Sequence, residues 1–312
     1  MNGLRAKISL YCLFLITMFS SCQKDLDIDF DSANIKQVLI ANVGANTRLF
    51  LNISKSKHPD DYNPVEFLKN CKVDLYENNI FIETLPFVLK DTLSGLGNYV
   101  STNILKENRT YKIVSTHAEL GTAIAEEFIQ PFPNSAQVTL LQHPDTINTN
   151  VRGKYLLTFQ DSASANNFYT IAVYYKAQKT IIDSLGVAQT KTDYLYNVPS
   201  YNAEVPNTAN SGKSFFTDAN FDGQYKSLEF DFSSMYSAYF PSLYSYYDEI
   251  FFIAEFSNVG PANYKWYIQQ LPRSDDNFND GQNERVNFSS NIQNGFGHFS
   301  SHSSVYRSIR LK

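Results

Sequence analysis

The 312-residue chain has little cysteine, methionine or tryptophan, with three, three and one of these residues respectively. A scaffold built on several disulfides is therefore excluded. Only 18% of the residues are charged. Lysine and arginine gather in no single stretch, so the basic surface of a nucleic-acid-binding protein is not expected. Phenylalanine and tyrosine are abundant instead, with 24 and 21 residues, and aromatic side chains favour the half-buried surfaces of β-sheets.

The N-terminal sequence MNGLRAKISLYCLFLITMFSSC has the pattern of a bacterial secretion signal. Arg5 and Lys7 precede an apolar run over residues 8–19 that is too short to span a bilayer, and two serines then precede Cys22. In a lipoprotein signal, the cysteine after the small residues receives a diacylglycerol and cleavage occurs before it. We therefore predict a signal peptide over residues 1–21 and a lipid on Cys22. The alternative is an ordinary signal peptide in which Cys22 has no role.

Attachment to the membrane is expected to rest on this lipid, because no later apolar segment has transmembrane length. Residues 22–34 are acidic and are predicted to form a solvated tether. Within it, Lys24-Asp25 resembles the export signal that sends lipoproteins of Bacteroidota to the outer face of the outer membrane. Cys12 leaves with the signal and Cys22 is lipidated, so Cys71 has no partner for an intramolecular disulfide. We expect Cys71 to be a small buried hydrophobe.

Two β-rich domains are predicted from the spacing of short apolar segments and turn signals. Residues 35–130 contain about seven candidate strands and suggest an N-terminal β-sandwich of immunoglobulin or fibronectin type. Three prolines among polar residues mark a linker over 131–150, and residues 151–312 form a second β-rich domain. Asn78-Asn79 suits a hairpin turn, and Pro261 suits the first turn of a short helix. The expected fold class is mainly β: two β-sandwich-like domains with one or two short helices.

The segment FTDANFDGQYKSLEFDF has the spacing of a calcium-binding loop. Asp218, Asn220, Asp222 and Glu229 occupy positions 1, 3, 5 and 12 of an EF-hand loop, with a glycine at position 6 for the sharp turn. The flanks do not look helical, however, and the alternation in KSLEFDF predicts a strand that carries Glu229 away from the loop. Two interpretations stay open: an acidic turn without metal, and a calcium site in which the first three residues are better ligand candidates than Glu229.

A second candidate site is the tyrosine-dense segment MYSAYFPSLYSYYDE. Tyr239, Tyr244, Tyr246 and Tyr247 could form an aromatic platform that contacts a sugar or a peptide, because tyrosine combines apolar area with a polar tip. The alternative is a loop that packs on a sheet.

Motifs of catalysis are missing from the sequence. The five histidines include no His-Glu-x-x-His pair, and there is no Gly-x-Ser-x-Gly motif, phosphate-binding loop or dinucleotide fingerprint. No catalytic residue and no cofactor is therefore expected, apart from the candidate calcium.

The C-terminal sequence SSNIQNGFGHFSSHSS resembles a family signature. Asn291-Ile292, the run from Asn294 to Gly297 and Phe299 are similar to the end of a Bacteroidota lipoprotein family catalogued as domain of unknown function 4249. YKWYIQQL resembles its tyrosine-rich helix, and FFTDANFDG its strand and turn between sheets. Independently, Gly295 and Gly297 suit a tight turn at positive φ, either as a structural closing turn or as a ligand-binding loop.

The resemblance implies a surface or periplasmic lipoprotein of two β-rich domains, of a kind often found alongside TonB-dependent outer-membrane transporters, with no established activity. We expect a non-enzymatic binding protein, lipid-anchored on the outer membrane, more on the cell surface than on the periplasmic face, and accessory to a TonB-dependent nutrient transporter. One alternative is a surface hydrolase acting on polysaccharide or peptide, which requires catalytic groups converging in one cleft. The other is an envelope structural or adhesion lipoprotein with a flat contact surface.

Overall fold

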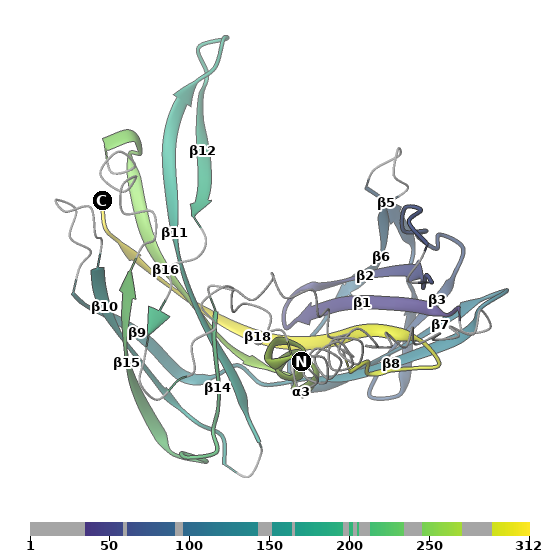
Figure 1. Ribbon diagram of the computed structural model, residues 1–312. Helices are drawn as coiled ribbons and strands as arrows, with labels where there is room; N and C mark the ends of the chain where they lie inside the picture. Colours follow the sequence, from purple (N-terminus) through teal and green to yellow (C-terminus); the bar gives the residue numbers. More distant parts are fainter. Residues whose placement is uncertain are drawn as a thin grey trace, which may run out of the picture. The chain divides into compact units, whose positions relative to one another are not determined.

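The computed structural model describes residues 35–58, 61–90, 96–142, 152–163, 166–195, 200–201, 205, 213–233, 245–269 and 289–312. Residues Ile35–Lys312 form one compact unit, which is mainly β and contains the short helix α3 (Figure 1). The predicted signal peptide, the tether and Cys22 lie outside the described residues. The elements are β1 (Gln37–Gly44), β2 (Arg48–Lys55), β3 (Lys72–Glu77), β4 (Ile80–Thr84), β5 (Phe87–Leu89), β6 (Gly97–Ile104), β7 (Arg109–His117), β8 (Gly121–Ile129), β9 (Asn134–Gln142), β10 (Arg152–Gln160), β11 (Phe168–Ile182), β12 (Ala188–Leu195), β13 (Ser200–Tyr201), β14 (Lys213–Thr217), β15 (Tyr225–Ser233), β16 (Glu249–Val259), α3 (Pro261–Ile268), β17 (Ile292–Gln293) and β18 (Phe296–Arg310).

A nine-stranded sheet extends through this unit in the order β12-β11-β16-β18-β1-β2-β6-β5, with β14 also paired to β11. Its neighbouring strands are antiparallel except for β1 and β18, which pair in parallel from Val38 and Phe296 to Gly44 and His302. Two smaller sheets complete the unit: β13-β15-β10-β9 and β17-β8-β7-β3-β4.

The buried apolar side chains form two separate cores, one for each smaller sheet. The first lies between the five-stranded sheet and the part of the large sheet around β1, β2 and β6, and is mostly aliphatic. The second lies between the four-stranded sheet and the part around β11 and β16, and is rich in aromatic rings. Tyr155 and Phe230, for example, stack there with centroids 5.0 Å apart. The mainly β class with β-sandwich-like domains is thus confirmed.

Strand β18 belongs to both sandwiches. Its N-terminal half pairs with β1 and its C-terminal half with β16. Phe299 is buried in the first core, and Val305 and Ile309 pack against the second. The two sandwiches therefore share one continuous sheet, and the C-terminal strand contributes to the core formed mainly by residues 35–130.

The linker expected over residues 131–150 requires a correction. Its described part contains β9, which pairs with β10 and forms an edge of the four-stranded sheet. The prolines at 131 and 133 precede this strand, where their missing N–H groups interrupt no ladder hydrogen bond. Proline content therefore marked the entry to a strand rather than a connection between domains.

Several local expectations are confirmed. Asn78 and Asn79 have φ values of 49° and 67° and join β3 to β4, as a two-residue hairpin turn requires. Helix α3 begins at Pro261, and Cys71 is buried. No helix in the described part of the chain is long and apolar enough to cross a membrane.

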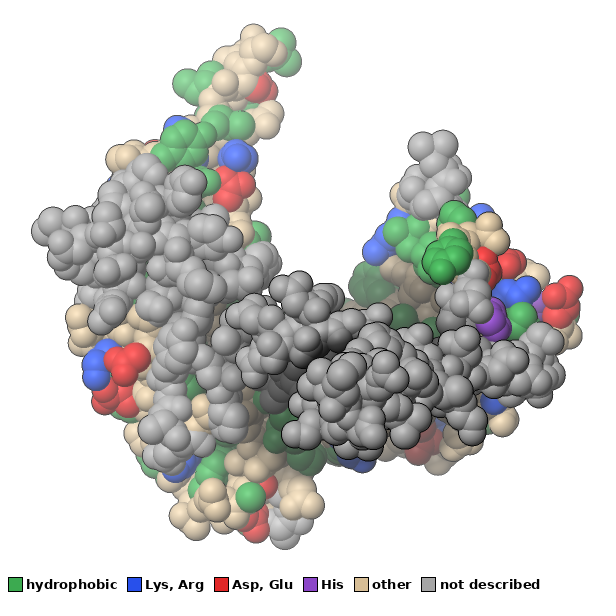
Figure 2. Space-filling model, viewed as in Figure 1, with side chains coloured by type: hydrophobic (Ala, Val, Ile, Leu, Met, Phe, Trp, Pro, Cys, Tyr) green, Lys and Arg blue, Asp and Glu red, His purple; other side chains and the backbone are tan. Residues whose placement is uncertain are grey.

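Charged side chains of both signs are mixed on the visible face of the molecule. Figure 2 shows lysine and arginine interspersed with aspartate and glutamate there, rather than gathered in one basic patch. Oppositely charged side chains also form ion pairs, such as Lys154–Glu229 with an N···O distance of 2.8 Å and Lys72–Asp74 with one of 2.7 Å. That no nucleic acid is a partner stays a prediction.

Candidate functional site

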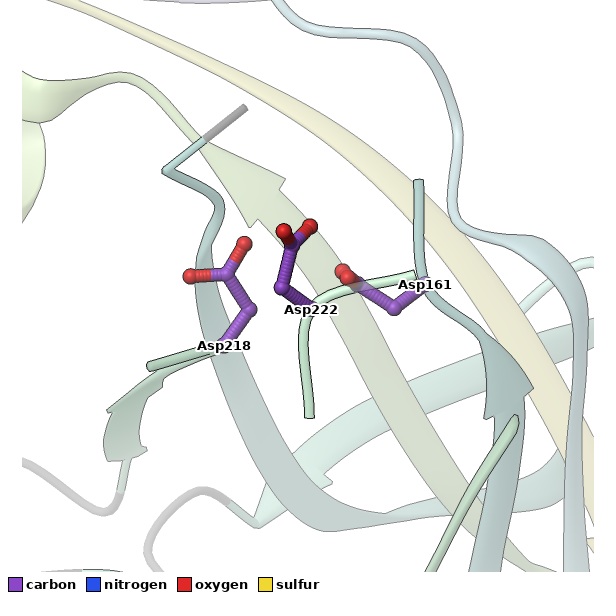
Figure 3. Close-up of side chains that lie close together, drawn as sticks. All are labelled: Asp161, Asp218 and Asp222. Carbon is purple, nitrogen blue, oxygen red and sulfur yellow. The ribbon is translucent and has the colours of Figure 1, made fainter. Parts of the chain in front are cut away.

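The turn between β14 and β15 brings three carboxylates together. Asp218 and Asp222 lie on this turn, and Asp161 follows the end of β10 (Figure 3). One oxygen of each residue lies within 4.8 Å of the others. Asp161 and Asp218 are buried, with 3% of each residue exposed, whereas Asp222 is exposed.

Hydrogen bonds within the protein already engage the two buried carboxylates. Asp161 accepts from the backbone N–H of Gly223 at 2.7 Å and from the Tyr169 hydroxyl at 2.5 Å. Asp218 accepts from the backbone N–H of Asn167 at 2.8 Å. Gly223 has a φ of +70°, which favours glycine there. These bonds hold the turn against the segment after β10, which is a structural role that needs no metal.

Asn220 and Glu229 do not join the acidic group. Asn220 is exposed on the turn. Glu229 lies on β15, where it faces outward and pairs with Lys154 of the neighbouring strand. The strand starts at Tyr225 and alternates faces with a period of two, so Glu229 is carried along the strand instead of curling back, unlike the last ligand of an EF-hand. Calcium stays a prediction, with Asp161 as the residue that sequence spacing missed.

The tyrosine platform is only partly within the described residues, because Tyr239 and Tyr244 lie outside them. Tyr246 is half exposed, with the Lys179 ammonium 3.4 Å from its ring centroid. Tyr247 is buried in the second core and donates a hydrogen bond to Asp193 at 2.6 Å. Tyr247 therefore supplies packing rather than an interaction surface, because adjacent residues on an irregular segment point in different directions.

A cavity of about 500 Å³ lies between helix α3 and the outward face of the nine-stranded sheet. This volume is typical of small-molecule sites, which measure ~300–1,000 Å³. Strands β1 and β18 form one wall, and Asn263, Trp266 and Tyr267 of α3 form another. The sheet alternates here: Leu39 and Ala41 point into the first core, whereas Ile40 and Asn42 point out towards the helix side.

The wall of this cavity contains the aromatic rings of Trp266, Tyr267, Phe296 and His298. The rings of Trp266 and His298 stack with centroids 5.3 Å apart and an interplanar angle of 25°. Tyr267 packs against Phe215 of β14, with ring centroids 4.2 Å apart. Phe296, at the start of β18, remains 43% exposed. These contacts attach α3 to the sheet through two rings. The third ring, that of Phe296, is partly exposed and has the Lys36 ammonium 5.4 Å from its centroid.

Polar atoms that no described residue satisfies also line the cavity. Asn263 is 4% exposed, and its Nδ2 donates to the Ser301 carbonyl at 3.3 Å and to Asn42 Oδ1 at 3.5 Å. Its Oδ1 accepts no hydrogen bond from the described part of the chain. Asn42 Oδ1 also accepts from His302 Nδ1 at 3.0 Å and from Ser300 at 3.3 Å, which leaves the Asn42 Nδ2 donor unused among these residues.

His298 is a neutral group within this wall. Burial lowers its pKa from 6.5 to about 4, because a low-dielectric environment disfavours the charged imidazolium. Its ring nitrogens make no hydrogen bond to the residues that the structure describes. His298 can thus offer one donor and one acceptor to a bound molecule at neutral pH.

A second, smaller cavity adjoins the first across Asn42, Asn263 and Tyr267, which line both. Its volume is about 30 Å³, enough for about one water molecule. Lys213 and Glu255 line it, whereas the described lining of the large cavity contains no charged side chain.

The start of α3 is capped from another sheet. The helix has no side-chain cap of its own, and Gly260 precedes Pro261. The Glu127 carboxylate of β8 accepts hydrogen bonds from the Ala262 backbone N–H and from Ser301 Oγ, the latter at 3.4 Å. A side chain at Gly260 would collide with Glu127, since an added Cβ would lie 1.9 Å from its Oε1. Burial raises the Glu127 pKa to about 7.

The glycine-rich turn before β18 has a structural role. Asn294 adopts a φ of 57° and Gly297 a φ of 116°, whereas Gly295 is not at positive φ. A Cβ on Gly297 would lie 2.0 Å from the Leu39 carbonyl oxygen, and one on Gly295 would lie 2.9 Å from that of Gln37. Both glycines therefore permit close approach to β1, and Gly297 also lines the cavity.

Comparison with known proteins adds a family but no activity. Residues 23–308 match the model of a family described as a domain of unknown function (DUF4249). No curated protein matches the chain.

Proposed function

Because the chain belongs to the family described as a domain of unknown function (DUF4249), we propose its function from its own residues: a non-catalytic, lipid-anchored binding protein of the bacterial outer membrane. The observation that carries the proposal is the aromatic cavity between α3 and the nine-stranded sheet, with the size and lining of a small-molecule site. The lipoprotein pattern ending at Cys22 supplies the anchor.

The described lining of the large cavity favours binding over catalysis. It includes no carboxylate and no lysine, so it lacks the pair of acids that a glycosidase uses. Its histidine, His298, makes no hydrogen bond to a serine or cysteine among the described residues, as activation of a nucleophile would require. The acidic group at Asp161 lies elsewhere and is engaged by backbone donors.

We further propose that the protein serves a TonB-dependent outer-membrane transporter, holding a nutrient near the barrel. A surface-anchored protein with a small-molecule cavity and no catalytic motif fits this role. The interaction is tested by isolating the tagged, lipidated protein from its native membranes in mild detergent and identifying co-purifying proteins by mass spectrometry. A stoichiometric TonB-dependent barrel is expected. Recovery of the protein alone, from membranes that contain such barrels, argues against the accessory role.

The anchor is tested separately by Cys22→Ala. We expect this variant to appear in the soluble fraction, because the remaining chain offers no apolar segment of transmembrane length. Cys71→Ala is the matched control, since Cys71 is buried in the first core and carries no lipid in this proposal. A Cys22→Ala protein that stays in the membrane fraction contradicts lipid anchoring.

A further inference from the structure

We propose that the cavity under α3 binds a neutral saccharide, with one sugar ring packed against its aromatic wall; this rests on the proposed binding function and specifies its ligand class. Three properties of the described lining support this ligand class: apolar rings, polar atoms without a hydrogen-bond partner among the described residues, and no charged side chain.

The apolar part of the wall suits the C–H face of a pyranose ring. Phe296 and Ile40 lie on neighbouring strands, and both line the cavity with 43% and 52% of their surfaces exposed. The Trp266–His298 stack lies beside them. A sugar ring presents C–H groups on its face and hydroxyl groups on its rim, so it can cover exposed ring and aliphatic surface without losing hydration of its hydroxyls.

The free polar atoms require a ligand that both donates and accepts. Asn263 is 4% exposed, and its Oδ1 is an acceptor that uses none of the described donors. Asn42 Nδ2 is a donor, and His298 provides one of each. A hydroxyl group donates and accepts at once, so adjacent hydroxyls can satisfy donors and acceptors placed side by side. A purely apolar ligand would leave Asn263 Oδ1 unsatisfied, which costs ~1–3 kcal/mol for a buried polar group.

The charge of the lining selects against ionised ligands. Its described residues include no lysine, arginine, aspartate or glutamate, and burial keeps His298 neutral at physiological pH. A carboxylate or ammonium inside the cavity would lose water without gaining an opposite charge from these lining residues. The Lys36 ammonium lies 5.4 Å from the Phe296 ring centroid but is not part of the lining. Lys213 and Glu255 lie beside the adjoining cavity, which is too small for a sugar ring.

Trp266 makes the proposal directly measurable, because it is the only tryptophan in the chain and it lines the cavity. The probes are maltotriose, cellotriose, lactose and N,N′-diacetylchitobiose, with trigalacturonate as the charged counterpart. The lipidated mature protein is kept in a polyoxyethylene detergent, because glucoside and maltoside detergents carry sugars. We expect a saturable change in tryptophan fluorescence with at least one neutral saccharide and none with trigalacturonate.

Matched variants then locate the binding. Phe296→Ala and Asn42→Ala are expected to weaken Kd by at least ~10-fold, through loss of ring contact and of a hydrogen-bond donor. Phe50→Ala and Asn52→Ala are the controls: these residues lie on β2, on the same outward face of the sheet, and do not line the cavity. All four variants are checked for an unchanged melting temperature, and Phe296→Leu serves if the alanine variant fails to fold.

Each outcome decides a different point. Neutral-saccharide binding that the cavity variants weaken and the controls retain supports the inference. Binding that the cavity variants leave unchanged, or that trigalacturonate shares, overturns it. A fluorescence response to peptides alone overturns the saccharide class but leaves the binding function standing. If no probe responds, the saccharide class is rejected, and co-purification with a barrel decides the accessory role independently.

Discussion

Glu127 links the five-stranded sheet to the helix that lines the cavity. Its ionisation should lower the stability of the protein as the pH rises. The carboxylate lies at the N-terminus of α3, where it accepts a hydrogen bond from Ala262. Helix N-termini favour negative charge, yet burial outweighs this effect and raises the Glu127 pKa to about 7 from 4.5. Ionisation is thus less favourable in the folded protein than in the unfolded chain.

The pH dependence of the unfolding free energy is set by the difference between the folded and unfolded pKa values of Glu127. A carboxyl group with a raised folded-state pKa contributes stability that is complete below pH 4.5 and is lost as the pH rises through 7. With these two values, the pKa difference lowers the free energy of unfolding by ~3 kcal/mol at pH 8 and by ~1 kcal/mol at pH 5. Glutamine retains an acceptor oxygen for Ala262 and cannot ionise. The difference in unfolding free energy between Glu127→Gln and wild type should therefore be ~2 kcal/mol larger, in favour of the variant, at pH 8 than at pH 5.

The assay is urea denaturation of wild type and Glu127→Gln at pH 5 and pH 8, followed by circular dichroism. The difference between the two pH values removes any constant effect of the amide. Glu126→Gln is the matched control, because Glu126 is the preceding residue of β8 and is exposed. A Glu127→Gln effect that is equal at both pH values, or larger at pH 5, refutes the reasoning that burial controls this carboxyl group.

Three further predictions concern other parts of the structure. Wild type should lose ~2 kcal/mol of unfolding free energy between pH 8 and pH 5 through His298, and His298→Phe should remove this loss. The reason is that a histidine with a lowered pKa stabilises the fold above pH 6.5 and loses that contribution as the pH falls towards 4. Denaturation at both pH values measures the loss, and an equal loss in the variant contradicts the prediction. Asp161→Asn should destabilise by ~1–3 kcal/mol through weaker acceptance from Gly223 and Tyr169; if calcium binds there, millimolar calcium raises the melting temperature of wild type but not of the variant, and no shift in wild type leaves hydrogen bonding as the role of the group. Gly297→Ala should cost more than ~2 kcal/mol, because its Cβ would meet a backbone oxygen at 2.0 Å and its φ is 116°; a melting temperature equal to wild type contradicts this.

Local patterns predicted most of the strands, because alternating apolar and polar residues indicate a strand with one buried face. In β7, Tyr111, Ile113 and Ser115 are buried while Lys112 and Val114 are less so, which is the alternation expected of a strand with one buried face. The direction of Glu229 followed from the same rule. Asn78-Asn79 carried its own turn signal, because asparagine tolerates positive φ.

Contacts between distant segments could not be predicted from such patterns. Asp161 joins Asp218 only because β10 pairs with β15 along its full length, which places their ends together. The cap on α3 comes from Glu127 on β8, a strand that lies far from the helix in the sequence. The outward residues of β1 and β18 have the sequence pattern of half-exposed strand positions, and nothing local shows that a helix covers them.

The location of the cavity follows from the path of β18 between the two cores. A strand that contributes to two cores has a stretch between them that belongs to neither. Between Phe299 and Val305, the residues of β18 are four serines and His302. Ser301 and Ser303 donate to carbonyls at the end of β8, so this stretch is bound by hydrogen bonds rather than by apolar packing. Helix α3 covers the other side through Asn263, Trp266 and Tyr267 without filling it. The site therefore lies where the two sandwiches meet, and it depends on both ends of Ile35–Lys312: β1 supplies one wall and β18 the other. Changes that shift β18 relative to β1, such as Gly297→Ala, should therefore alter ligand binding as well as stability.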